Sequence, residues 1–203
     1  LQHRGQESTG ISAADDSGVS TYKAMGHVAD VYTEDVLHRL PGKNSIGHTR
    51  YSTAGDSSSD NAQPIVVKSA YGEVSLCHNG NLINAVALRK ELESEGAVFQ
   101  STSDSEVILH LLARADAENL DDALVQALRR IQGAFSLLLL SEGTLIAARD
   151  SYGFRPLCIG RFNGAYTVAS ESCAFDLINA SYLREVQPGE VVVITGDELR
   201  SIS

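Results

Sequence analysis

Four short polar segments contain residue types that could bind and activate a small substrate. They are residues 2–6, 47–55, 78–81 and 101–106. Each lies where a predicted strand or helix meets a loop, which is where functional residues concentrate. Three positions define a chemistry. Arg50 could offer its planar guanidinium to a carboxylate, Asn79-Gly80 could direct a side-chain amide and a backbone N–H at one oxyanion, and Asp104 could receive an ammonium group.

Each of these positions also has an ordinary structural interpretation. Arg50 could form a surface salt bridge, and Asn-Gly is the commonest tight turn, which we favour for Asn79-Gly80 taken alone. Ser103 with Glu106 fits a helix capping box, and Asp104 could merely complement the helix dipole. Together, however, the segments supply a cation, an anion and oxyanion donors. That combination predicts a pocket for a free amino acid whose side-chain carbonyl is attacked, with only the nucleophile missing.

Other chemistries lack their motifs. Gly42-Lys43 resembles the end of a phosphate-binding loop, but Leu37 and Asn44 stand where that motif needs Gly and Ser or Thr. There is no GxSxG elbow of a serine hydrolase. The six histidines show no metal-ligand spacing, so we expect no metal site.

Composition restricts the partners and the compartment. The 203 residues carry a net charge of -10 without a Lys/Arg cluster, which argues against nucleic acid and anionic membranes as partners. The longest apolar run, residues 134–140, is far shorter than a membrane helix. The three cysteines are widely separated and no secretory signal is present, so we expect a cytoplasmic protein with reduced thiols that serve as small packing residues.

Hydrophobic periodicity predicts hairpins at both ends of the chain and helices between them. We expect a mobile polar loop at residues 55–61 and a hairpin turn at Asn163-Gly164. The predicted strands are residues 9–14, 20–26, 45–49, 65–69, 74–78, 134–140, 144–149, 157–161, 165–169 and 190–195. The predicted helices are residues 28–40, 84–95, 103–115 and 120–130. This order favours a layered α+β fold.

Six motifs in register resemble the class II glutamine amidotransferases, and within them the amidophosphoribosyltransferase branch. They are LQHRGQESTGI (1–11), GHTRYSTAG (47–55), HNGNL (78–82), TSDSE (102–106), ARDSYGFRPL (148–157) and ASESCA (169–174). The resemblance covers the whole chain. It implies an N-terminal nucleophile hydrolase fold, a four-layer αββα sandwich of two stacked, mainly antiparallel sheets, with residues 1–203 forming one glutaminase domain.

The resemblance also implies a mechanism and a role for each site residue. A cysteine at the mature N-terminus attacks the carboxamide of glutamine, and the ammonia released travels to a second domain that makes phosphoribosylamine for purine synthesis. Asn79 and Gly80 would form the oxyanion hole. The substrate-binding residues implied by the motifs are Arg50 for the carboxylate, Asp104 for the ammonium, Thr53 nearby, and Arg4 and Gly5 beside the nucleophile. The loop after Arg50 would close over glutamine.

Two departures from the family pattern concern the ends of the chain. The nucleophilic cysteine is expected roughly twenty residues before Leu1, so the chain as printed should bind glutamine without hydrolysing it. The phosphoribosyltransferase domain, with its Mg²⁺ and any iron–sulfur cluster, is also absent, and no cofactor is expected here. The partners implied are glutamine and that domain, in an enzyme that forms a homo-oligomer.

Two alternatives remain open. The chain could come from another class II enzyme, such as a hexosephosphate aminotransferase or asparagine synthetase. It could also be a glutamine-binding domain without catalytic activity. Tyr51-Ser52, Asn81-Leu82 and residues 155–157 favour the phosphoribosyl branch.

Overall fold

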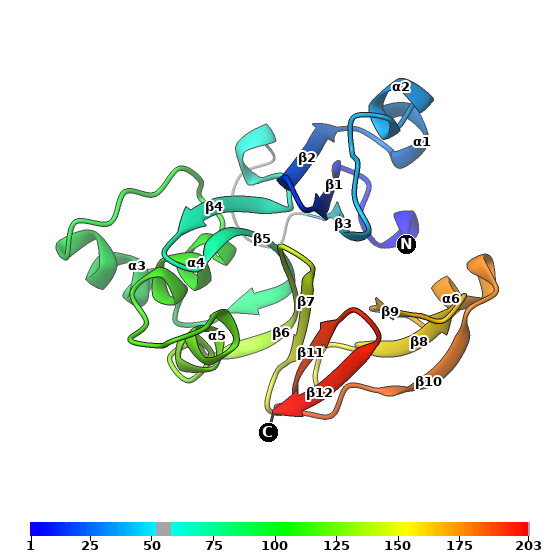
Figure 1. Cartoon of the computed structure of the whole chain (residues 1–203). Helices are drawn as coiled ribbons and strands as arrows, with labels where there is room; N and C mark the ends of the chain where they lie inside the picture. The colour runs from blue at the N-terminus through cyan, green and yellow to red at the C-terminus, as the bar shows by residue number, and fades with distance from the viewer. Residues whose placement is uncertain (52–57, 203) are drawn as a thin grey trace.

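A six-stranded antiparallel sheet forms the centre of the molecule (Figure 1). The computed structural model describes residues 1–51 and 58–202. The strand order is β12-β11-β7-β6-β5-β4. The strands are β4 (Ile65–Ser69), β5 (Gly72–Leu82), β6 (Gly133–Ser141), β7 (Thr144–Arg149), β11 (Val191–Thr195) and β12 (Glu198–Ile202).

Three helices cover one face of this sheet: α3 (Ala85–Ser94), α4 (Ser105–Ala113) and α5 (Leu120–Leu128). Side chains alternate between the two faces along a strand, so β6 contributes to two cores. Leu137 and Leu139 belong to the helix-side core, whereas Leu138 and Leu140 pack on the opposite face.

Two smaller sheets cover that opposite face. One has the order β2-β1-β3 and contains β1 (Ser8–Asp15), β2 (Gly18–Met25) and β3 (Asn44–Arg50). The other has the order β10-β8-β9 and contains β8 (Cys158–Phe162), β9 (Ala165–Ala169) and β10 (Ser181–Glu185). Ile46 of the first packs near Cys77 and Leu140, and Ile159 of the second packs near Val192.

In the described part of the chain, the helices beside these smaller sheets are short (Figure 1). Phe175 of α6 (Cys173–Ile178) is buried against Cys158 and Ala169. Layered α+β architecture with stacked antiparallel sheets is therefore confirmed. Within the described part of the chain, the second sheet layer is divided into two three-stranded sheets, which periodicity did not predict.

The single helix predicted at residues 28–40 is wrong. The chain forms two short helices instead, α1 (Val28–Val31) and α2 (Glu34–Leu37), and neither contains a buried residue. Thr33 interrupts the run because its hydroxyl accepts a hydrogen bond from the Val36 N–H and starts a new helix. Without a buried apolar face, no tertiary contact favours one continuous helix over two capped turns.

Two local predictions near the polar segments are also wrong. Asn79-Gly80 is not a turn, because β5 continues to Leu82 and pairs with β6 along its whole second half. The capping box is absent, since α4 begins after Asp104 and the Glu106 carboxylate accepts N–H bonds from Gln100 and Ser101 instead. At Asn79-Gly80 the pairing with a distant strand overrides the turn propensity, whereas Glu106 binds backbone donors five and six residues before it in place of the capping contact.

The polar stretch at 55–61 is only partly described. Its described end forms the 3-10 helix η2 (Ser59–Asn61), and Asn61 is buried. The Asn61 amide donates to the Thr102 hydroxyl at 2.8 Å and its oxygen accepts the Thr102 N–H at 3.0 Å. This end is therefore anchored, contrary to the mobile loop predicted for the whole stretch. Thr53 and the remainder of the predicted loop lie outside the described residues. Among the helices described, none has the length and apolarity to cross a bilayer.

Candidate active site

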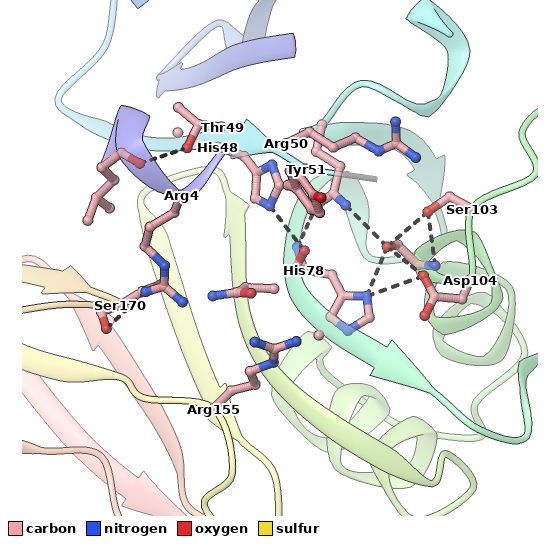
Figure 2. A pocket seen from close by; sticks show the side chains of 16 residues that line it. Arg4, His48, Thr49, Arg50, Tyr51, His78, Ser103, Asp104, Arg155 and Ser170 are labelled. Atoms are coloured by element: carbon pink, nitrogen blue, oxygen red, sulfur yellow. Dashed lines mark hydrogen bonds and ion pairs between the residues drawn. The ribbon is translucent and has the colours of Figure 1, made fainter. Parts of the chain in front are cut away.

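The four polar segments converge on one cavity of about 290 Å³. It lies where the first small sheet, the central sheet and the start of α4 meet (Figure 2). Five of the seven site residues predicted from the sequence line it: Arg4, Arg50, Asn79, Gly80 and Asp104. The cavity is near the lower end of the size range for small-molecule sites, which suits a single amino acid.

Arg50 is the last residue of β3 and one of the few buried charged residues, with only 4% of its surface exposed. The surface salt bridge considered for it is therefore wrong. A guanidinium Nη1 atom lies 3.5 Å from Oε2 of Glu7, so a carboxylate already stands beside this arginine. A buried guanidinium that is partly balanced by an acid remains able to bind a second carboxylate at a site where water screens little.

The edge of β5 brings backbone donors to the cavity. Strand β4 pairs with β5 only from Gly72 to Leu76, so the edge beyond that point faces the site. Backbone groups of alternate residues point to the same edge. The His78 N–H donates to the Gln63 side chain at 2.6 Å, and the Leu82 N–H donates to Asp104 at 2.9 Å. The Gly80 N–H, midway between them, consequently points to the cavity edge.

The Asn79 side chain lies on the face of β5 that is turned toward the smaller sheets, and it also lines the cavity. It stands across from Ser136 of β6, and its side chain follows the alternation that places Cys77 against the smaller sheets. Gly80 has no room for a side chain, because a Cβ atom would overlap the Ala134 carbonyl oxygen. The strand thus presents a side-chain amide and a backbone N–H at consecutive positions, as an oxyanion hole requires.

Asp104 is held at the start of α4 by backbone and side-chain contacts. Its Oδ2 accepts the Leu82 N–H, while Oδ1 lies 3.7 Å from Nδ1 of His78 and 3.5 Å from the Ser105 hydroxyl. The side chain is 10% exposed and lines the cavity. The carboxylate is therefore positioned for a cation from the cavity, and it makes no N-capping hydrogen bond to α4.

Two histidines lie inside the wall of the cavity. Burial lowers the pKa of His78, an effect that Asp104 opposes and Arg155 reinforces. Burial also lowers the pKa of His48 to about 4, with His78 as the next cause. His48 Nε2 lies 3.1 Å from the His78 carbonyl oxygen, and His78 Nδ1 lies 2.9 Å from the Ser105 hydroxyl. The low pKa keeps the His48 imidazole neutral near pH 7, and the contacts of both rings connect neighbouring segments of the cavity wall.

Arg4 and Gly5 have different positions. Arg4 is the last residue of the short helix η1 (Gln2–Arg4), and it lines the cavity, where it contacts Glu171 at 3.3 Å and the Ser170 carbonyl oxygen at 3.4 Å. Gly5 is not among the lining residues. It is buried behind the wall, where a Cβ would overlap the backbone of Thr49.

Sequence reasoning assigned no role to several lining residues, chiefly Arg155, His78 and Gln63. Arg155 belongs to one of the family motifs, but the sequence around a single arginine in a loop does not indicate where its side chain points. His78 and Gln63 act through hydrogen bonds between distant segments, for which local sequence has no signal.

No cysteine lines the cavity among the described residues. Cys77 and Cys158 are buried, as expected for packing residues, and burial raises the pKa of Cys77. Cys173 is exposed beside Glu171, so its predicted packing role is wrong. Within the ranges described, no group of three or more His, Cys, Asp or Glu side chains could hold a metal ion.

Comparisons with known proteins show the family of the chain. A family model described as a glutamine amidotransferase domain matches residues 48–176. The amidophosphoribosyltransferase of Bacillus subtilis is 44% identical over 202 residues, covering 99% of this chain and 42% of the relative. Amidophosphoribosyltransferase 2, chloroplastic, of Arabidopsis thaliana is 48% identical over 202 residues, covering 98% of this chain and 36% of the relative.

A solved structure of a relative has the same fold as this chain. Glutamine phosphoribosylpyrophosphate amidotransferase from B. subtilis, complexed with ADP and GMP, superposes with a TM-score of 0.94 at 42% identity. The match covers 100% of this chain and 44% of that one. The chain thus spans less than half the length of these relatives. Since the family model covers more than half of the chain, the chain belongs to the glutamine amidotransferase domain family.

Proposed function

We propose that this chain is the glutaminase domain of an amidophosphoribosyltransferase. In this proposal the domain, together with a nucleophilic cysteine before Leu1, hydrolyses glutamine to glutamate, and the ammonia reacts with phosphoribosyl pyrophosphate to make phosphoribosylamine. One observation carries the proposal. Arg50, the Asn79-Gly80 pair and Asp104 come from three separate segments of the chain and line one cavity of amino-acid size.

The arrangement suggests how glutamine would bind. Arg50 takes the α-carboxylate and Asp104 takes the α-ammonium, so that the two charges of the free amino acid have opposite partners. The carboxamide then extends along β5 toward Asn79. A peptide-linked glutamine lacks both α-charges, so the site would select the free amino acid. The family motif implies that Thr53 also contributes to binding glutamine, and it belongs to the same proposal.

Catalysis would need a thiolate nucleophile from a residue before Leu1. Leu1 itself lines the cavity, so a nucleophile carried by a residue before it could reach a bound substrate. The thiolate attacks the amide carbon, and the Asn79 amide and the Gly80 N–H stabilise the oxyanion. The C–N bond then breaks with proton transfer from the nucleophile's own amine, and water hydrolyses the thioester to glutamate.

The remaining parts of the proposed enzyme belong to the length that the relatives have and this chain does not span. A phosphoribosyltransferase domain would be the partner that consumes ammonia, with any Mg²⁺ or iron–sulfur cluster located there, and the enzyme would be a homo-oligomer. The proposed glutaminase reaction uses side chains, backbone donors, the nucleophile's own amine and water. The three unbonded cysteines favour a reducing compartment such as the cytoplasm.

The test is a coupled assay on the complete polypeptide encoded by the gene. We expect glutamate release from glutamine, loss of that release when the N-terminal cysteine is replaced by serine, and phosphoribosylamine formation when phosphoribosyl pyrophosphate is added. Glutamate release with a hexose phosphate as the only productive acceptor would assign the domain to another class II enzyme. Glutamine binding without any release would support a binding domain instead.

A further inference from the structure

The loop between β7 and β8 is built as a rigid platform. The carboxylate of Asp150, fully buried, accepts the backbone N–H groups of Tyr152, Phe154 and Arg155, each at 3.1 Å. The Arg149 guanidinium donates to the carbonyl oxygens of Gly153 and Arg155 at 2.9 and 2.7 Å. These hydrogen bonds fix the backbone of the loop at the residue that carries the Arg155 side chain.

This platform directs the Arg155 side chain into the cavity (Figure 2). The other two arginines of the cavity have acidic neighbours, since Arg4 contacts Glu171 and Arg50 contacts Glu7. Arg155 differs from both. Within the described part of the chain, its guanidinium forms no ion pair or hydrogen bond, although the residue is only partly exposed. A half-buried guanidinium without a partner is an anion-binding group.

The position of Arg155 separates it from the residues proposed for the α-groups. Figure 2 shows Arg4 and Arg155 on one side of the two histidines, with Arg50, Ser103 and Asp104 on the other. Building on the glutaminase function proposed above, we infer that Arg155 is a specificity-determining residue at the carboxamide end of the pocket, where it binds the γ-carboxylate of the product glutamate.

The chemistry of the reaction gives this residue a defined role. Hydrolysis adds water to glutamine and releases ammonia, so the α-carboxylate and α-ammonium keep their charges while the neutral γ-amide becomes a carboxylate. Negative charge therefore appears only at the end where Arg155 and Arg4 lie. Arg4 already contacts Glu171, whereas the Arg155 guanidinium has no acidic contact within the described residues, so Arg155 supplies most of the positive charge that distinguishes glutamate from glutamine.

The test compares product and substrate in the complete polypeptide. Arg155→Met removes the charge and keeps much of the apolar stem, and Arg129→Met is the matched control, because Arg129 is exposed and outside the cavity. We expect Arg155→Met to raise the competitive inhibition constant of glutamate by about 10-fold or more. The KM for glutamine should change by less than about 3-fold, because the amide is neutral. Arg155→Lys should restore part of the glutamate affinity, and the control should change neither constant.

Several outcomes would overturn the inference. Equal losses for glutamate and glutamine would mean that Arg155 binds the shared α-carboxylate, and unchanged constants would place it outside the binding site. A lower melting temperature with an unchanged ratio of the two constants would reveal a purely structural residue. These results differ from a failure of the proposed function, in which the unaltered polypeptide releases no glutamate at all and both proposals fall together.

Discussion

Replacement of Asp104 by asparagine tests the proposed ammonium site with little disturbance of the fold. The Oδ2 atom accepts the Leu82 N–H at 2.9 Å, and an amide oxygen can accept the same bond. The amide nitrogen would then occupy the Oδ1 position, close to His78 and Ser105. The variant keeps its shape and its backbone bond and loses its charge. We expect the melting temperature to change by less than about 4 °C, as for a loss below about 1 kcal/mol in a chain of this size.

The expected effect on glutamine follows from burial. The Asp104 side chain is only 10% exposed, so water screens its interaction with an ammonium group weakly. A hydrogen bond to a charged partner contributes about 1.5–3 kcal/mol. Since about 1.4 kcal/mol corresponds to a tenfold change in affinity, Asp104→Asn should lower kcat/KM for glutamine by about 10- to 150-fold.

A substrate analogue isolates the contact. 4-Carbamoylbutanoate has the carboxylate and carboxamide of glutamine and lacks the α-amino group. The unaltered enzyme should prefer glutamine over the analogue. Asp104→Asn should remove most of that preference, because the analogue has no α-amino group to interact with the Asp104 carboxylate. The assay follows glutamate release from glutamine and glutarate release from the analogue, in the unaltered enzyme and in Asp104→Asn. The four kcat/KM values form a double-mutant cycle that measures the coupling between Asp104 and the amino group.

The control variant is Asp197→Asn, which makes the same charge change at an exposed position outside the cavity. It should leave kcat/KM unaltered for both amides. Equal losses for glutamine and the analogue in Asp104→Asn would refute the ammonium site, because Asp104 would then act only by holding Leu82 and the edge of β5. Full activity toward both would reduce Asp104 to a structural residue.

Four further changes probe the rest of the pocket. Arg50→Lys should raise the KM for glutamine by about 10-fold or more, because a point charge replaces a bidentate fork; an unchanged KM would remove Arg50 from the pocket. Asn79→Ala should lower kcat by ~10²–10³-fold, as for loss of an oxyanion donor, and retained turnover would contradict that role. Gly80→Ala places a Cβ against the Ala134 carbonyl oxygen, so the free energy of unfolding should fall by about 1–3 kcal/mol in urea titrations; an unchanged midpoint would show that the strand can relax. The pKa of His48 is lowered from 6.5 to about 4 by burial, so the unfolded chain binds a proton at higher pH than the folded chain does. The contribution of this residue to the free energy of unfolding is therefore complete above about pH 6.5 and falls by at most about 3 kcal/mol as the pH drops toward 4. His48→Gln should make the urea unfolding midpoint depend less on pH over this range, and an unchanged pH dependence would assign the effect to other residues.

The fold was predictable where local pattern and tertiary structure agree. The alternation at 65–69 and 144–149 gives β4 and β7 with the predicted bounds, and Asn163-Gly164 adopts the positive φ values, 49° and 87°, of a tight hairpin turn. The helix predicted at 28–40 failed because periodicity records spacing and does not record whether a surface exists to bury it. β10 was not predicted because most of its residues are exposed and show no alternation.

The site was predictable in its residue types and much less in its geometry. Arg50, Asn79 and Asp104 were identified because their chemistry complements a free amino acid, and the cavity brings them together. The sequence pattern could not show that the oxyanion pair lies on a strand, since Asn-Gly favours a turn until β6 pairs with it. Nor could it show Arg155, whose direction depends on the hydrogen bonds that Asp150 makes to the loop.

The length and register of one strand explain why these residues meet. β5 extends six residues beyond its pairing with β4, from Cys77 to Leu82, and β6 fixes the register of this extension by placing Gly80 opposite Phe135. At this register the N–H of Gly80 points to the cavity and the Asn79 side chain points to the smaller sheets. A shift by one residue would turn the Gly80 N–H toward β6 and the Asn79 amide toward the helices, because both features alternate with a period of two. The oxyanion pair therefore depends on the β5–β6 register, and that register is held outside the cavity by Leu76 and Leu139 in the helix-side core.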